Sequence, residues 1–121
     1  MTTLKGGEFL IRETNAQDIF IPEQWNEEQL MIAQSCRDFL AKEIWPNLDR
    51  IDAQEEGLTV NLLDKAAELG LLGLNIPEQY GGFEKDFVTG MFATEILGAG
   101  HSFAVSISAH TGIGTLPILY Y

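Results

Sequence analysis

The stretch ILGAGHSFAVSISAHTGIGTLPILYY, residues 96–121, constrains the fold most strongly, because it contains no Asp, Glu, Lys or Arg. Glu95 is the last charged residue of the sequence. A membrane span has a similar composition, but glycine, serine, threonine and histidine residues interrupt this one, and transmembrane helices have longer apolar runs. We therefore expect a pair of helices buried inside a protein. Because the sequence stops at Tyr121 without a polar residue, we expect the natural chain to continue.

The overall composition predicts one acidic globular domain. The chain has 121 residues, 45% of them hydrophobic and 21% charged, which is typical of a folded domain. Eighteen acidic and seven basic residues give a formal charge of −11, which repels nucleic acid and anionic membranes, so neither is an expected partner. The single cysteine, Cys36, excludes an internal disulfide, and its apolar surroundings in the sequence predict a core residue in a reducing compartment.

The first half of the chain predicts an irregular arm followed by helices. Residues 1–25 contain Gly6-Gly7 and Pro22 and lack periodicity, so we expect an arm that lies on the domain. The helical domain is expected to span residues 26–121. Asn26-Glu27-Glu28-Gln29 is a capping signature, and Pro46 should kink or split the first helix near Trp45. Apolar residues recur through this helix at helical spacing, at Leu30, Ala33, Cys36, Leu40, Ile44, Leu48 and Ile51.

Two more helices flank a turn-rich connection. The second helix is expected over about residues 60–69, with Thr59 as its N-cap and Gly70 and Gly73 as candidate C-caps. Its packing face is expected to be Leu63, Ala66, Ala67 and Gly70. Residues 70–82 are first apolar and then rich in turn residues. The stretch 74–76 could form a short strand, but the helical context favours a buried crossover. The third helix is expected from Asp86 to about Leu97.

The uncharged stretch is expected to form a fourth and a fifth helix. The fourth should start at Ser102 and end between Thr111 and Gly114, and the fifth should open at Leu116-Pro117. No segment alternates at period two. The sequence therefore predicts an all-α fold, an antiparallel helical bundle with an irregular N-terminal arm.

No complete catalytic, cofactor or metal site is visible in the sequence. Neither G-x-G-x-x-G nor a P-loop occurs, and the two isolated G-x-G pairs, 98–100 and 112–114, are expected to break helices. No Glu stands three residues before a His, which excludes the di-iron pattern. The spacing of His101 and His110 does not suit a metal, and Glu95 is expected to be a helix-face or paired carboxylate.

Several motifs together resemble the N-terminal domain of acyl-CoA dehydrogenases. The central ones are Gly70-Leu71-Leu72-Gly73 and Ile76-Pro77-Glu78-x-Tyr80-Gly81-Gly82. The helix that opens at Asn26-Glu27-Glu28-Gln29 resembles the family's first helix, and His110-Thr111-x-Ile113-Gly114-x-x-Pro117-Ile118-Leu119 resembles its fourth and fifth. The resemblance covers about residues 25–121. It implies that a middle β-domain and a C-terminal helical domain would follow.

The resemblance also implies a function for the complete protein. Members bind FAD mainly with the two later domains, remove hydrogen from the α and β carbons of a fatty acyl-CoA, and pass electrons to an electron-transfer flavoprotein. The catalytic glutamate lies in the C-terminal domain, so no catalytic residue is expected here. The fourth helix helps to wall the acyl-chain cavity, and alignment places that wall at Val105, Ser106, Ala109 and Ile113. Tight helix packing is the alternative role of these small residues.

The arm favours one branch of the family. Lys5-Gly6-Gly7, Phe20-Ile21-Pro22 and Ser108-Ala109-His110 resemble the very-long-chain branch. A homo-oligomer, a dimer or a tetramer, would be expected, in the bacterial cytoplasm or the mitochondrial matrix, since no signal or transit peptide is visible. An acyl-CoA oxidase-like or nitroalkane oxidase-like flavoprotein stays open, as does a stand-alone helical module that buries residues 96–121 against a partner.

Overall fold

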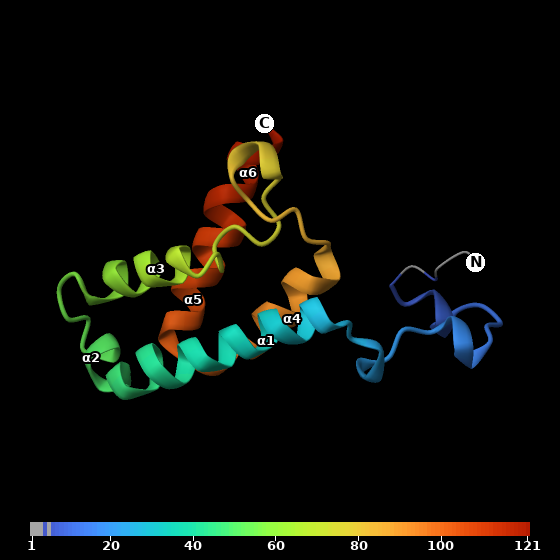
Figure 1. Cartoon of the computed structure of the whole chain (residues 1–121), viewed down its shortest axis with the longest axis horizontal. Coiled ribbons are helices and arrows are strands. Elements are labelled where there is room, and N and C mark those ends of the chain that lie inside the picture. The colour runs from blue at the N-terminus through green and yellow to red at the C-terminus, as the bar shows by residue number, and fades with distance from the viewer. Residues whose placement is uncertain (1–3, 5) are drawn as a thin grey trace.

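The computed structural model describes residue 4 and residues 6–121. Over these residues every regular element is a helix and no strand forms, which confirms the predicted all-helical fold. Figure 1 shows α1 and α4 at the base, α3 above α1, the last two helices crossing them toward the top, and the arm extending to one side. The α-helices are α1 (Glu27–Phe39), α2 (Leu48–Asp52), α3 (Leu58–Glu68), α4 (Phe87–Leu97), α5 (Ser102–Ser108) and α6 (Thr115–Tyr120).

Helix α1 begins where its capping signature predicts. The Asn26 side chain accepts a hydrogen bond from the Gln29 backbone N–H at 2.8 Å, and the Gln29 side-chain oxygen accepts one from the Asn26 N–H at 3.0 Å. The buried stripe of the helix is Gln29, Ala33, Cys36 and Phe39. The prediction of Leu30 as a core residue is wrong, because the stripe begins one position earlier and leaves Leu30 48% exposed.

The helix is interrupted at the predicted proline. A π-helical turn, Leu40–Ile44, leads into a 3₁₀ turn, Trp45–Asn47, that holds Pro46, and α2 follows. Proline has no N–H to donate within an α-helix, so the wider and tighter turns together accommodate it. This break lets Ile44 and Ile51 face the same core.

Helix α3 starts two residues before the predicted position. Its N-cap is Gly57, which adopts a left-handed φ of 76°, so the assignment of Thr59 as the cap is wrong. The buried residues of α3 are Leu62 and Ala66, while Ala67 is exposed, which shifts the predicted packing face. The end of the helix is as predicted.

A Schellman motif at Gly70 ends α3. Gly70 has a φ of 76°, its N–H donates to the Ala67 carbonyl at 2.8 Å, and the Leu71 N–H donates to the Ala66 carbonyl at 2.9 Å. Leu71 and Ala66 are both buried, so the motif also turns the chain into the core. Gly73 does not adopt a left-handed conformation, and its prediction as a cap is wrong.

The connection over residues 70–86 is a hydrogen-bonded crossover without a strand. Backbone bonds run from the Phe83 N–H to the Gly73 carbonyl at 3.0 Å and from the Glu84 N–H to the Ile76 carbonyl at 2.9 Å. A Cβ on Gly82 would lie 2.0 Å from the Ile76 carbonyl oxygen, so only glycine permits this approach of the two backbones. The crossover returns the chain to the end of the molecule where α1 begins.

Helix α4 lies beside α1 and runs in the same direction. Near their starts the buried Gln29 side-chain amide donates to the Thr89 hydroxyl at 3.0 Å, and near their ends the Trp45 indole N–H donates to the Ala99 carbonyl at 3.1 Å. Asp86 caps α4 as predicted and accepts from the Thr89 N–H at 2.8 Å. The predicted antiparallel pairing holds for α3, which runs back along α1 (Figure 1).

Residues 102–120 form one continuous helix, in which α5 and α6 are joined by the π-helical turn Ala109–Gly114. The predicted break between a fourth and a fifth helix is therefore wrong. The π turn accommodates Gly112, Gly114 and the following Pro117, because its wider spacing relieves the backbone mismatch that proline creates. The Thr111 hydroxyl donates to the Ile107 carbonyl at 2.9 Å within this segment.

The core lies where α1, α3, α4 and α5 meet. Phe103 is fully buried, and its ring centroid lies 5.8 Å from that of Phe39. In the middle of α4 the Trp25 ring stacks on Phe92 with centroids 4.0 Å apart and planes 1° apart, and Phe20 packs edge-on against Trp25 at 4.9 Å. These rings attach the arm to the helical body.

Candidate functional site

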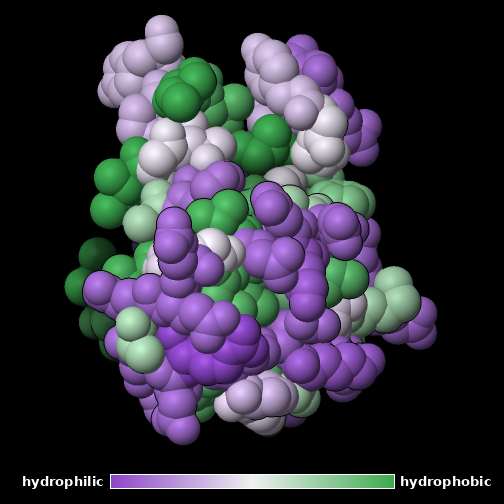
Figure 2. Space-filling view, turned by 90° about the vertical axis from the view of Figure 1, so that its left-hand side faces the viewer, coloured by the Kyte–Doolittle hydropathy of each residue, from purple (hydrophilic) through white to green (hydrophobic). Residues whose placement is uncertain are grey.

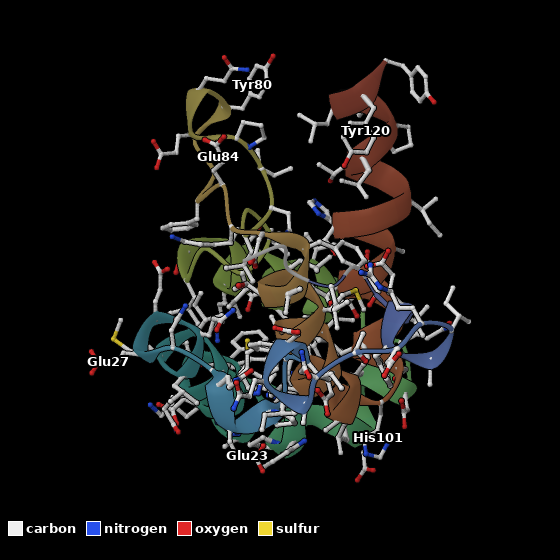
Figure 3. All side chains as sticks on the ribbon, turned by 90° about the vertical axis from the view of Figure 1, so that its right-hand side faces the viewer. Glu23, Glu27, Tyr80, Glu84, His101 and Tyr120 are labelled. Carbon is white, nitrogen blue, oxygen red and sulfur yellow. The ribbon has the colours of Figure 1, made fainter. Side chains whose placement is uncertain are left out.

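A cleft of about 410 Å³ lies between the crossover, α4 and the helix over residues 102–120. Figure 3 shows the two projections beside it, the crossover with Tyr80 and Glu84 and the helix end with Tyr120. Figure 2 shows hydrophobic residues gathered in the upper part of another face, around the hollow between the projections, and hydrophilic residues below. The apolar lining includes Leu71, Leu72, Leu74, Ile76, Met91, Ala93, Leu97, Ile107 and Leu116.

Most polar groups of the cleft are already bonded to the protein. The Thr94 hydroxyl donates to the Gly90 carbonyl at 2.9 Å, and the Asn75 amide donates to the Lys85 and Asp86 carbonyls at 3.0 and 2.9 Å. The Lys85 ammonium lies 2.6 Å from a Glu28 carboxylate oxygen. The cleft can therefore receive an apolar group.

The four predicted wall residues lie on another face of the same helix and do not line this cleft. Val105 and Ile113 are 71% and 83% exposed, Ala109 is exposed and Ser106 is half-buried. Val105, Ala109 and Ile113 follow one another at intervals of four, which places them on one outward face that we call the outer stripe. The described residues do not cover this stripe, so a cavity against it would need a second wall from residues outside the described chain.

The residues of this helix that line the cleft are not among the predicted wall residues. They include Ile107, Ser108, Thr111, Gly112 and Leu116. The sequence does contain a pattern that indicates this face. Two sets of positions recur at helical spacing opposite the apolar crossover, namely 107 and 111, and 108, 112 and 116. The predicted break after Thr111 concealed it.

The predicted burial of residues 96–121 is observed only in part within the described part of the chain, where Leu97, Phe103 and Ile107 are buried. Only 11% of the 102–120 helix is buried, and by length and composition alone this helix could cross a membrane. Ile118 is 84% exposed and Tyr120 is 68% exposed. This uncharged helix therefore presents a large exposed apolar surface, which is typical of an interaction face.

The described residues do not form a site for the diphosphate of FAD. Both G-x-G pairs lie within helical turns, Gly98–Gly100 and Ala109–Gly114, so their backbone amides do not form a phosphate loop. The one lysine at the cleft is paired with Glu28.

The remaining candidate residues are one buried thiol and three exposed side chains. Cys36 is fully buried, and burial raises the pKa of its thiol to about 11, which makes it a poor nucleophile and confirms the core prediction. Glu95 and both histidines are exposed, and His101 has a φ of 55° at the turn into α5. Among residue 4 and residues 6–121, no three His, Cys, Asp or Glu side chains are grouped as metal ligands.

A second groove, of about 240 Å³, lies between α1, the end of α3 and the crossover. Met31, Leu69 and Phe83 line it and are 65%, 54% and 50% exposed. Glu28 and Lys85 stand at its edge. This groove is shallow and mostly apolar.

Comparison with known proteins gives a consistent result. The family model described as "Acyl-CoA dehydrogenase, N-terminal domain" matches residues 26–121. A protein of Bacillus subtilis named probable acyl-CoA dehydrogenase is 39% identical over 117 residues, which are 97% of this chain and 20% of that protein. A second Bacillus subtilis protein, named acyl-CoA dehydrogenase, is 38% identical over 96 residues, which are 78% of this chain and 25% of that protein.

The fold agrees with a solved structure. An acyl-CoA dehydrogenase of Bacillus anthracis, crystallised in complex with FAD, superposes with a TM-score of 0.87 at 41% identity. The alignment covers 95% of this chain and 20% of the crystallised one. The chain thus spans a fifth to a quarter of the length of the relatives it matches.

Proposed function

Because this chain belongs to the acyl-CoA dehydrogenase family, whose N-terminal domain it matches, we propose that it is part of a flavin-dependent enzyme that desaturates fatty acyl-CoA. The reaction removes one hydrogen from the α carbon and one from the β carbon and leaves a trans double bond, as in β-oxidation. FAD supplies the electron acceptor within the enzyme, and an electron-transfer flavoprotein is the proposed external partner. The names of the relatives and the FAD in the solved structure support this assignment.

Within that enzyme, we propose that the chain supplies one wall of the acyl-tail cavity. The carrying observation is the outer stripe: Val105, Ala109 and Ile113 form an exposed, uncharged face on a helix whose surface the described residues leave uncovered. Ser106 flanks the stripe and completes the proposed wall. The opposite wall would come from the remaining four-fifths of the protein.

The chemistry of the stripe suits a fatty tail. Each methylene group that leaves water for an apolar wall contributes about 0.8 kcal/mol to binding. No charged residue lies between Ile96 and Tyr121, so no charge has to be desolvated when a tail enters. Ala109 has a small side chain, which leaves space for the tail beside Val105 and Ile113.

The proposed function is tested with the full-length protein encoded by the gene. Its activity is measured on acyl-CoA thioesters of graded chain length, once with electron-transfer flavoprotein and once with oxygen as the acceptor. We expect turnover with the flavoprotein acceptor and little hydrogen peroxide. Rapid peroxide formation would instead identify an acyl-CoA oxidase, and turnover of nitroalkanes alone would identify a nitroalkane oxidase. A protein without activity on any acyl-CoA would contradict the proposal.

A further inference from the structure

The helix over residues 102–120 is held by the rest of the described chain only near its start. Phe103 and Ile107 are its buried residues, and none of residues 108–121 is buried within the described part of the chain. The two buried residues lie one turn apart on the same face, so they hold that face against the core but give little resistance to a sideways swing of the helix. Figure 3 shows His101 at the root of this helix and Tyr120 near its far end. The direction of the helix therefore depends on how its root is fixed.

The root is a turn between α4 and this helix, residues 98–102, which we call the corner, and its backbone is strained at His101. His101 has a φ of 55° and a ψ of −127°, a conformation that glycine adopts readily and that residues with a side chain rarely adopt. Such a conformation persists only where the surrounding contacts enforce it. Opening the corner would relieve the strain, so the corner needs restraints that hold it in this shape.

Two restraints come from the interrupted part of the first helix. The Trp45 indole N–H donates to the Ala99 carbonyl at 3.1 Å. Gly100 is buried, and a Cβ on it would lie 3.2 Å from the Cδ2 atom of Leu40, so the corner backbone passes close to the π-helical turn. Both contacts hold the corner on its α4 side. Neither of them is made by the helix that follows.

The third restraint is made by the helix itself. The hydroxyl of Ser102, its first residue, donates to the Asp52 carboxylate at the end of α2. A helix rises by about 1.5 Å per residue, so Ile113 lies roughly 16 Å along the axis from this bond, and a swing of about 10° at the root would move it by roughly 3 Å. Van der Waals contacts lose a large part of their energy when a gap of about 1 Å opens. A small change at the root is therefore enough to remove the contacts of the outer stripe.

We propose that Asp52 and Ser102 are positioning residues that set the chain-length preference of the enzyme, because their bond holds the outer stripe in place. The inference rests on the proposed function, since it requires the stripe to wall the acyl tail. Neither residue belongs to the proposed wall, so both act through the direction of the helix. A displaced stripe loses its contacts with methylene groups that only long tails place against it. Binding of long tails is therefore weakened more than binding of short ones.

Steady-state kinetics of the full-length protein on acyl-CoA thioesters of graded length test the proposal. Asp52→Ala removes the acceptor of the bond, whereas Asp52→Asn keeps an oxygen that accepts from the Ser102 hydroxyl. Asp49→Ala is the matched control, because Asp49 is also an exposed acid of α2 and its side chain has no hydrogen bond or ion pair within the described chain.

The expected result is a selective rise in KM. Loss of contact with one or two methylene groups corresponds to about a 4- to 15-fold weaker binding, so Asp52→Ala should raise KM for long acyl-CoA by this factor. Its kcat, and its KM for short acyl-CoA, should stay within about twofold of the wild type. Asp52→Asn and Asp49→Ala should retain the wild-type profile.

Hydrogen exchange of the same full-length proteins measures the corner without substrate. The Ala104 N–H donates to the His101 carbonyl at 3.0 Å at the root of the helix. Loss of one hydrogen bond beside it should speed exchange of the amides of residues 101–106 by about 2- to 10-fold in Asp52→Ala, and not in Asp52→Asn or Asp49→Ala.

The outcomes separate this inference from the proposed function. Unchanged exchange in Asp52→Ala would overturn the inference, as would faster exchange with an unchanged chain-length profile or an equal loss at every chain length. An active wild type with any of these results would leave the proposed function intact. A wild-type protein that turns over no acyl-CoA would refute the proposed function, and with it this inference, whatever the exchange shows.

Discussion

Replacing Gly82 with alanine should destabilise the protein by about 2–4 kcal/mol, because the crossover has no space for a Cβ at this position. The new atom would lie 2.0 Å from the Ile76 carbonyl oxygen and 2.5 Å from its carbon, both parts of the backbone. Overpacking of this kind costs about 1–3 kcal/mol, and separating the two backbone segments of the crossover would weaken the bond from the Glu84 N–H to the Ile76 carbonyl, worth about 1 kcal/mol.

The assay is chemical unfolding, followed by tryptophan fluorescence and circular dichroism. Gly98→Ala is the matched control, because a Cβ at Gly98 meets nothing within 4 Å and its φ of −55° suits any residue. The control should leave stability unchanged or raise it by up to about 1 kcal/mol. If Gly82→Ala were as stable as the wild type to within about 0.5 kcal/mol, the close approach described for the crossover would be refuted.

Three further results are expected. Hydrogen bonds from the Thr89 hydroxyl and N–H lower the pKa of Asp86. The contribution of Asp86 to the free energy of unfolding is therefore fully present above its unfolded pKa and is lost as the pH falls through its folded pKa. Asp86→Ala should cost about 1 kcal/mol of stability at pH 7 and flatten this acid dependence in unfolding titrations. The thiol of Cys36, with its pKa of about 11, should react with a maleimide at pH 7 only upon unfolding, and labelling of the native protein within minutes would contradict its burial. A double-mutant cycle of Trp25→Ala and Phe92→Ala should give a coupling energy of about 0.5–1.5 kcal/mol in the same unfolding assay, whereas additive effects would mean that the stack is not formed.

The helix starts that the sequence predicts well are those set by local chemistry. Asn26 and Asp86 cap their helices because a side-chain oxygen and an N–H three residues away suffice, and Pro46 interrupts its helix because it lacks a donor. The start of α3 was misplaced because Gly57 makes no side-chain bond and reveals itself only by its backbone conformation. Periodicity places Leu30 on the apolar face of α1, but the buried stripe begins one position earlier, at Gln29, and Leu30 is therefore exposed.

The arrangement around the candidate site depended on long-range effects. Glycine and proline after Thr111 predicted a break, whereas a π turn continues the helix. That continuity carries Leu116 and Tyr120 into the cleft with Ile107. The resemblance to a family located the outer stripe on this helix, but neither periodicity nor composition could tell which face a second domain would cover, because those residues lie outside the described chain.

The central claim, that the outer stripe walls an acyl-tail cavity, is tested most directly by the chain-length dependence of kcat/KM for Ala109→Phe in the full-length enzyme. Ala67→Phe on α3 is the control, since Ala67 is equally a small exposed helical residue. A phenyl ring that excludes about four methylene groups from the wall should cost roughly 3 kcal/mol, more than about a hundredfold, on long acyl chains and little on short ones. The account predicts this selective loss with FAD content unchanged. An equal loss at every chain length, or no loss at all, would contradict it.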